Sequence, residues 1–265
     1  MTLKIDKRKK YVMILDVETN RDQEICDLGF LIGDLEGNIV AKRAFMVKEH
    51  FQVPFYFERL RPLYRERLKD PNYPMWLASA KKVGMEIEKA IRHFRVAEVY
   101  AYNAGFDKRK VEQLANKFDF PNPLRNVEVD CLWFWSAQTI FQQKSFVNFA
   151  NEHNFLTEKG NIKTSAEVCY AYINGIPEFE EEHTGLEDCV IEYEIFLHCK
   201  KQRKFRAKGI CHNPWLLVQS KEQIEKLPPQ FRTMKFNLEF EIERAEMLVD
   251  RMEKDLKIEL EEKDF

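Results

Sequence analysis

Two acidic residues stand close together near the start of the chain, directly after a short apolar segment. Tyr11–Leu15 is typical of a buried strand, and Asp16 and Glu18 follow it. In a strand, residues at i and i+2 face the same side, so the two carboxylates would lie next to each other. Divalent cations such as Mg²⁺ or Mn²⁺ would offset their repulsion. An isolated Asp-x-Glu triplet carries little weight among 44 Asp and Glu residues, and a solvated strand end explains it as well.

Further residues of the same chemical kind occur at element boundaries along the chain. Asp107 follows the apolar segment Val96–Tyr102 and stands at a strand-to-helix junction, where ligands collect in α/β proteins. His183 and Asp188 stand at the start of a later helix. Acidic residues there can simply favour the helix dipole, which accounts for Glu180–Glu182 but not for the histidine. Chance explains one such match easily and three in this order poorly.

These residues and their neighbours resemble three motifs of the DEDD-type 3′→5′ exonucleases. The resemblance is to the His variant, which includes the proofreading subunit of bacterial DNA polymerase III and ribonuclease T. The family's Asp-x-Glu-Thr is matched by Asp16-Val-Glu-Thr19, its Asn-x-x-Phe-Asp by Asn103-Ala-Gly-Phe-Asp107, and its His followed five residues later by Asp is matched by His183 and Asp188. The resemblance covers about residues 11–199 and is closer to stand-alone phage or bacterial exonucleases than to a polymerase domain.

The resemblance implies a mechanism with two metal ions. Four carboxylates would hold two divalent ions, Mg²⁺ or Mn²⁺, about 3.5–4 Å apart. His183 would act as the general base, which an ordinary histidine pKa near 6.5 allows at neutral pH. The implied metal ligands are Asp16, Glu18, Asp107 and Asp188. Together with His183, these four residues are also the implied catalytic residues.

The resemblance also implies a substrate. Asn103 and Phe106 would shape the second motif, and Thr19 would contact the terminal nucleotide. We expect hydrolysis of single-stranded nucleic acid, with DNA favoured, from a free 3′ end to nucleoside 5′-monophosphates. A 3′→5′ exoribonuclease, a non-catalytic nucleic-acid-binding protein with the same fold, and an interaction protein that works through its C-terminal helix remain alternatives. The presence of all five chemical residues argues against the non-catalytic protein.

The elements that must position these residues predict an α/β fold with an RNase H-like mixed sheet. Three strands joined by tight connections predict an antiparallel meander, in which Gly37 supplies the positive φ of the second turn. Strands followed by helices come next, as in β/α units. The expected strands after residues 11–15 are 25–32, 39–47, 96–102 and 127–130, and the expected helices are 76–94, 108–118, 145–154, 165–173 and 185–200.

Two segments fall outside this pattern. Residues 48–74 mix aromatic residues with arginines and four prolines, which indicates either a wall that binds bases and phosphates or an insertion packed by its own aromatics. Lys200–Lys208 carries six basic residues in nine, either a phosphate-contacting stripe or a solvated helix end. A charged helix is expected from about Glu239 to Glu262, docked on the core or paired in a homodimer. We therefore expect an exonuclease domain over residues 1–205 and a helical extension over 206–265.

Composition limits the function classes. The net charge of −2 over 265 residues means that nucleic-acid binding would rest on local basic patches. Six cysteines without a Cys-x-x-Cys pair suit reduced thiols. The N-terminal apolar segment is too short for a secretory signal, and no segment of about 20 apolar residues could span a membrane. We expect a cytoplasmic protein without a membrane partner.

Overall fold

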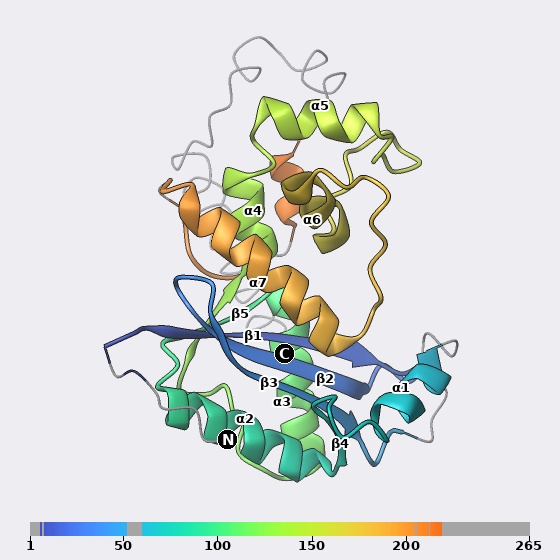
Figure 1. Ribbon diagram of the computed structural model, residues 1–265, viewed down its shortest axis with the longest axis vertical. Helices are drawn as coiled ribbons and strands as arrows, with labels where there is room; N and C mark the ends of the chain where they lie inside the picture. Colours follow the sequence, from blue (N-terminus) through green and yellow to red (C-terminus); the bar gives the residue numbers. More distant parts are fainter. Residues whose placement is uncertain (1–5, 7, 52–59, 205, 212, 219–265) are drawn as a thin grey trace, which may run out of the picture. The chain divides into compact units, whose positions relative to one another are not determined.

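The sheet in this computed structural model has six strands, with β1 (Tyr11–Thr19) among its central members. The structure describes residues 6, 8–51, 60–204, 206–211 and 213–218. The strand order is β4-β3-β2-β1-β5-β6 (Figure 1). Strands β1, β2 and β3 pair antiparallel, whereas β5 pairs parallel with β1 and with β6, and β4 pairs parallel with β3. The remaining strands are β2 (Ile25–Asp34), β3 (Ile39–Val47), β4 (Met75–Ala78), β5 (Glu98–Ala101) and β6 (Glu128–Cys131).

This arrangement confirms the expected α/β fold with an RNase H-like mixed sheet that begins as a meander. All ten residues of β2 are buried, which explains its nearly continuous apolar sequence. The turn between β2 and β3 has Gly37 at a φ of 101°, in the region that favours glycine. Asp34 closes this turn, because its Oδ1 accepts hydrogen bonds from the backbone N–H groups of Glu36 and Asn38.

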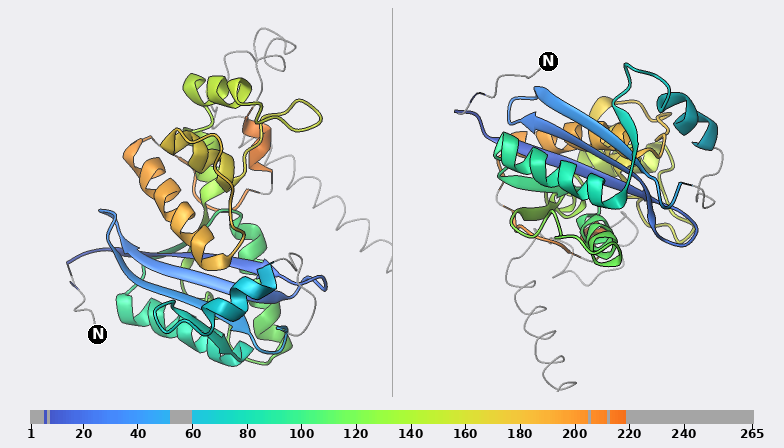
Figure 2. Two further views of the ribbon diagram at one scale, coloured as in Figure 1. Left: turned by 45° about the vertical axis from the view of Figure 1, so that its right-hand side comes forward. Right: turned by 90° about the horizontal axis from the view of Figure 1, so that it is seen from below.

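Helices cover both faces of the sheet, as Figures 1 and 2 show. On one face, α2 (Ala80–Phe94) and α3 (Ala104–Lys117) pack on side chains such as Met13 and Leu15. On the other face, α7 (Gly185–Lys201) packs on Val12 and Ile14. The alternation along β1 therefore aims Asp16 and Glu18, which continue the even-numbered positions, toward α7.

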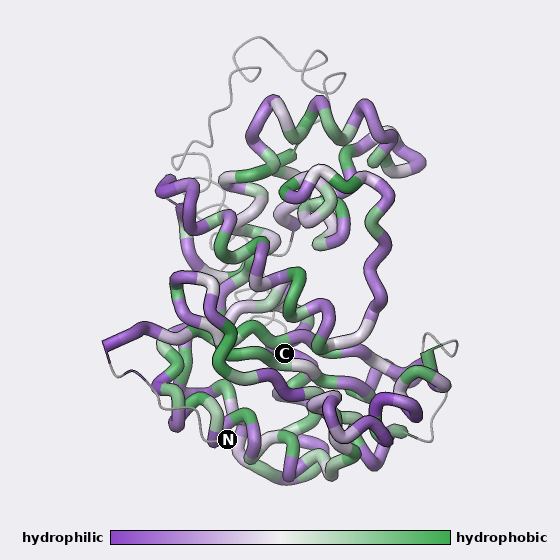
Figure 3. The backbone as a smooth tube through the Cα atoms, viewed as in Figure 1, coloured by the Kyte–Doolittle hydropathy of each residue, from purple (hydrophilic) through white to green (hydrophobic). Residues whose placement is uncertain are grey.

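Three helices extend the α7 layer and share its hydrophobic core. They are α4 (Leu132–Thr139), α5 (Lys144–Glu152) and α6 (Ala166–Asn174). A short 3₁₀ helix, Pro214–Leu217, contacts α4. The connection between α6 and α7 is largely hydrophilic, as Figure 3 shows, in contrast to the strands beneath it. None of the helices in the described part of the chain combines the length and the apolar character that crossing a bilayer requires.

One expected element was wrong at its start, and two helices were not expected. Met75–Ala78 is not the start of a helix but the edge strand β4, and α2 begins only after Ser79, whose hydroxyl accepts a hydrogen bond from Lys82 N–H. The edge of β3 offers unpaired backbone groups, and pairing with it outweighs helix propensity in so short a segment. Helix α4 was not expected, because a short buried helix lacks the 3.6-residue periodicity of an amphipathic one. The insertion also contains a helix, α1 (Arg61–Arg67).

The basic run Lys200–Lys208, which begins in the last turn of α7, is partly tied to the protein itself. Arg206 forms an ion pair with Asp130 at 2.5 Å and lies over the Trp135 ring, at 3.7 Å from its centroid. Lys208 pairs with Glu98 at the start of β5. These residues fasten the segment to the β5–β6 edge, whereas Lys201 and Arg203 of the same run are exposed. Phosphate binding by this run remains a prediction.

The C-terminal part of the chain separates from the rest. The chain divides into one compact unit, Met1–Val218, and a second, Gln219–Phe265, which lies outside the described residues. The expected helix over Glu239–Glu262 and the homodimer through it fall on that second unit. The boundary expected after residue 205 therefore stays a prediction, as does the role of the extension.

Candidate active site

One open cavity of about 470 Å³ brings together residues from all three sequence motifs. It lies where the ends of β1 and β5 meet the first turns of α3 and α7. Seven of the eight expected site residues line it: Asp16, Glu18, Asn103, Phe106, Asp107, His183 and Asp188. Thr19 is not among the residues that line it and pairs with Ile25 at the end of β1. Residues separated by up to 172 positions in the sequence thus share one site, and their roles remain predictions.

Parallel pairing of β1 and β5 explains how two of the motifs meet. The carboxyl ends of parallel strands lie at the same edge of a sheet, and α3 starts directly after β5. Asp107 lies in the first turn of α3, and its Oδ1 accepts a hydrogen bond of 3.2 Å from Val17 N–H. This bond fixes the third carboxylate against the strand that carries Asp16 and Glu18.

A glycine pair explains how the third motif reaches the same place. Gly29 of β2 lies opposite Asp16 in the strand register and contacts the first residue of α7, Gly185. A Cβ atom on Gly29 would lie 2.2 Å from the backbone carbonyl group of Gly185, so only glycine allows this approach. Asp27 holds the same junction, because its Oδ2 accepts a hydrogen bond of 2.9 Å from Gly185 N–H. Asp188 follows within the first turn of α7.

We predict that Gly29→Ala destabilises the protein and weakens the site. The added methyl group meets backbone atoms, which cannot move aside as a side chain could, so α7 must shift away from β1. Overpacking of this kind costs about 1–3 kcal/mol, and urea denaturation would measure it. Gly105→Ala is the matched control, because its Cβ would meet only a methyl group of Ile210, at 3.1 Å. An equally stable Gly29→Ala protein would show that the close contact is not needed.

The carboxylates at this site are buried or half-buried. Oδ2 of Asp16 and Oδ1 of Asp188 are buried and have no hydrogen-bond partner. Among the described residues, neither Lys nor Arg lines the cavity. Glu18, His183 and Asp188 each offer an atom that lies within 4.8 Å of the other two. Burial of unpaired carboxylates is costly, so the site suits a cation that the chain itself does not supply.

The pKa values of these acids are all raised above their usual values. Burial, followed by nearby carboxylates, raises the pKa of Glu18 to about 8 and that of Asp16 well above its usual value. Burial also raises the pKa of Asp107 to about 7, although its backbone hydrogen bonds act in the opposite direction. The pKa of Asp188 is raised to about 10, first by burial and then by the nearby charge of Glu181. A bound divalent cation would favour the ionised forms and reverse these shifts.

Two acidic residues of the site were missed in the sequence. Glu192 lies one turn after Asp188 on α7, is buried, lines the cavity, and raises the pKa of Asp16 by its charge. The i, i+4 spacing of Asp188 and Glu192 was a usable signal, because it places both on one helix face. Glu181 also lines the cavity, and its Oε2 lies 3.8 Å from Nδ1 of His183. The helix-dipole interpretation therefore does not describe Glu181.

His183 has an unusual backbone conformation. Its φ is 58°, in the left-handed region that residues other than glycine rarely adopt. Such a conformation costs on the order of 1 kcal/mol or more and persists only where the surroundings impose it. The side chain lines the cavity while 36% of it is exposed, so the imidazole can exchange protons with water. The residue that follows, Thr184, is fully buried and precedes α7.

Aromatic side chains form one wall of the cavity. The rings of Tyr102 and Trp133 are stacked, at 6.5 Å between centroids and 16° between planes. Thr164 holds both, because its backbone carbonyl accepts a hydrogen bond from the Tyr102 hydroxyl and its Oγ1 accepts one from Trp133 Nε1. Phe106 adds a third ring to this wall. Asn103, at the N-cap position of α3, is exposed, and its side chain makes no capping hydrogen bond. Fixed aromatic rings of this kind offer stacking surfaces for bases.

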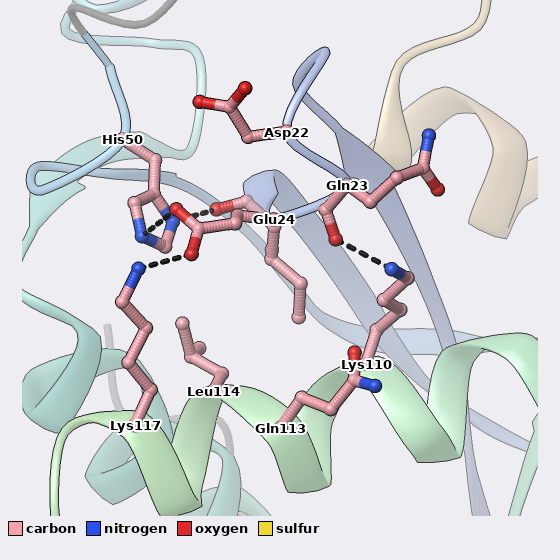
Figure 4. Close-up of a pocket in the computed structure, with 9 residues that line it drawn as sticks. Asp22, Gln23, Glu24, His50, Lys110, Gln113, Leu114 and Lys117 are labelled. Carbon is pink, nitrogen blue, oxygen red and sulfur yellow. Dashed lines mark hydrogen bonds and ion pairs between the residues drawn. The ribbon is translucent and has the colours of Figure 1, made fainter.

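A second cavity, of about 420 Å³, lies between α3 and the turn that follows β1 (Figure 4). Its cationic groups already have partners: Glu24 pairs with Lys117 and with Nε2 of His50, and Lys110 donates a hydrogen bond to the carbonyl of Gln23. These contacts tether α3 to the turn after Thr19, and so they help to fix Asp107 relative to β1.

Comparison with known proteins adds little to these observations. No protein-family model matches the chain, and no curated protein does. One of the solved structures that match is the crystal structure of cell-death related nuclease 4 (CRN-4). It is 14% identical, the match covers 76% of this chain and 67% of that chain, and the TM-score is 0.47. At this distance the function must be inferred from the residues of the chain itself.

Proposed function

We propose that this protein is a metal-dependent 3′→5′ exonuclease that hydrolyses single-stranded nucleic acid, with DNA favoured, to nucleoside 5′-monophosphates. The observation that carries the proposal is the convergence of Asp16, Glu18, Asp107, His183 and Asp188 in one cavity. They come from three distant segments: the second half of β1, the first turn of α3, and the start of α7 with the residues just before it. Phosphodiester hydrolysis requires a polarised phosphate, an activated water and a stabilised leaving oxygen, and this donor set suits those tasks.

The donor set fits divalent cations of the Mg²⁺ or Mn²⁺ type. Hard cations prefer carboxylate oxygens, and the unpaired buried oxygens of Asp16 and Asp188 lack any other partner. Asp16, Glu18, Asp107 and Asp188 would hold two such ions. When bound, the ions would acidify a water and stabilise the leaving 3′ oxygen.

The chain's own groups would complete the reaction. His183 would accept the proton of the attacking water and pass it to solvent through its exposed edge. Glu181, beside Nδ1, would stabilise the imidazolium that forms. The ring of Phe106 and the stacked pair of Tyr102 and Trp133 would hold the terminal base. Contacts of Asn103 and Thr19 with the terminal nucleotide also remain part of the proposal.

Matched DNA and RNA oligonucleotides of one sequence would test this function. With a 5′ label and Mn²⁺ or Mg²⁺, we expect a ladder that shortens one nucleotide at a time from the 3′ end. Mass spectrometry should identify nucleoside 5′-monophosphates, and a circular strand should stay intact. Cleavage of the circle, or release of 3′-phosphates, would contradict the proposal. Faster decay of RNA would favour the exoribonuclease, and binding without hydrolysis would favour the non-catalytic protein.

A further inference from the structure

We propose that Arg67, on helix α1 of the insertion, is a positioning residue that holds His183 toward the cavity. The segment it acts on is residues 178–184, called the base loop below. This inference rests on the proposed function, because it takes His183 as the general base. The sequence of the insertion, residues 48–74, suggested either base and phosphate binding or packing by its own aromatic residues. Positioning of His183 would be a third role.

The Arg67 guanidinium contacts the residues on both sides of His183. Its Nη2 lies 2.7 Å from Oε2 of Glu182, and its Nη1 donates a hydrogen bond of 3.0 Å to Oγ1 of Thr184. The same Nη1 lies 3.1 Å from Oε2 of Glu187 in the first turn of α7. A planar guanidinium with several fixed donors can hold such an arrangement, which a lysine ammonium cannot reproduce.

Neighbouring groups fix the guanidinium in turn. Only 12% of the Arg67 side chain is exposed, and its Cζ lies 4.7 Å from the centroid of the Tyr73 ring. The Tyr73 hydroxyl donates to the Glu187 carboxylate at 2.7 Å, and so does the Thr184 hydroxyl. The Glu187 side chain is 31% exposed, so its ion pair with Arg67 is screened less than a pair between two exposed groups. Arg67 of α1 and Tyr73 therefore meet at one carboxylate of α7, that of Glu187.

The insertion is itself anchored at the same junction. Tyr64 of α1 is buried in a small apolar cluster that includes Leu186, the second residue of α7. Helix α1 thus packs on the start of α7 as well as bonding to it, in the region where Figure 1 shows the base loop descending to the sheet. A shift of α1 would therefore displace the residues that flank His183.

The base loop needs an external support of this kind. Phe179 packs on Tyr170 at 4.6 Å between ring centroids, and after it the sequence runs Glu-Glu-Glu-His-Thr before α7 begins. Three adjacent carboxylates repel one another and give the loop no apolar anchor. His183 nevertheless holds a strained φ of 58°, so something must impose it. Among the described residues, Arg67 supplies the cation in contact with the loop.

A double-mutant cycle tests the proposal. If Arg67 acts through His183, Arg67→Ala should lower kcat about 10- to 100-fold in the wild type and have no further effect in a His183→Ala background. The affinity of the Arg67→Ala protein for Mn²⁺, measured by calorimetry, should stay within about threefold of the wild-type value, because the proposed metal ligands remain. Arg65→Ala is the matched control, since it removes the same charge from an exposed position of the same helix. It should leave kcat unchanged.

Two milder variants keep the test decisive if Arg67→Ala fails to fold. Tyr73→Phe removes one hydroxyl and should lower kcat less than Arg67→Ala, and Arg67→Lys should recover only part of the rate. Equal losses from Arg67→Ala in both backgrounds, or wild-type kcat in Arg67→Ala, would overturn the proposal.

Amide hydrogen exchange separates this proposal from the function on which it rests. Exchange in residues 178–184 should become at least tenfold faster in Arg67→Ala and stay unchanged in Arg65→Ala. This measurement needs no substrate. A wild-type protein without nuclease activity would therefore refute the proposed function, while exchange would still report whether Arg67 holds the loop. Unchanged exchange in that segment would overturn the positioning role.

Discussion

Replacing Asp16 by Ala should lower the rate of hydrolysis and the affinity for metal together, whereas replacing His183 by Ala should lower only the rate of hydrolysis. Asp16 lies half-buried at the centre of the carboxylate cluster and has one buried, unpaired oxygen, so its loss would remove one of the proposed metal ligands. His183 lies at the edge of the cluster and is partly exposed. Its loss should lower kcat by roughly 10²–10⁴-fold, the usual contribution of a general base, while Mn²⁺ still binds.

Calorimetric titration with Mn²⁺ and steady-state rates on one oligonucleotide would measure both effects. Asp22→Ala serves as a control, because it removes an exposed carboxylate from the turn after β1, outside the proposed site. A His183→Ala protein that keeps wild-type turnover would mean that another group takes the proton. Retained metal affinity in Asp16→Ala would mean that the cation is held elsewhere.

The sheet was predictable because its signals are local. Strands β1 to β3 follow from apolar runs and from one turn that contains Gly37, and the carboxylates at their ends follow from the two-residue period of a strand. The edge strand β4 was not predictable in this way, because four residues carry too little periodicity. Ser79 was nevertheless a usable signal for the true start of α2, since serine is a preferred N-cap.

The candidate site was predictable as a set of positions and not as a geometry. The motifs named seven lining residues, and only the fold shows why they meet. Gly29 and Gly185 are 156 positions apart, and neither lies in a turn that would mark it as special. The same is true of Arg67 and Glu182, whose contact depends on where the insertion folds back. Long-range contacts of this kind have no local pattern, whereas the spacing of Asp188 and Glu192 did have one.

Removing the metal should abolish activity and also make the protein less stable as the pH rises. In the metal-free protein, burial and neighbouring charges raise the pKa of Glu18 to about 8, and burial raises that of Asp107 to about 7. In the unfolded chain both groups titrate near pH 4. The folded protein therefore binds more protons between about pH 4 and pH 8, so its free energy of unfolding falls over that range.

Only part of the two pKa shifts is expected to appear as lost stability. Each unit of pKa shift corresponds to about 1.4 kcal/mol per group, and relaxation of the site will reduce the sum. A net loss of about 3 kcal/mol would lower the Tm by roughly 6–12 °C for a domain of this size. We expect thermal denaturation in EDTA to show a Tm lower at pH 8 than at pH 5 by about that amount.

Divalent cations should reverse this loss where it is largest. Because they bind ionised carboxylates of the folded state, Mn²⁺ or Mg²⁺ should raise the Tm at pH 8, have little effect at pH 5, and restore hydrolysis that EDTA abolished. Glu18→Gln is the informative variant, since it removes one titrating carboxylate at nearly constant shape. Its Tm in EDTA should fall less between pH 5 and pH 8, and Mn²⁺ should stabilise it less. A wild-type Tm in EDTA that is as high at pH 8 as at pH 5 would mean that the carboxylates ionise without a cation, and full hydrolysis in EDTA would exclude the two-metal site.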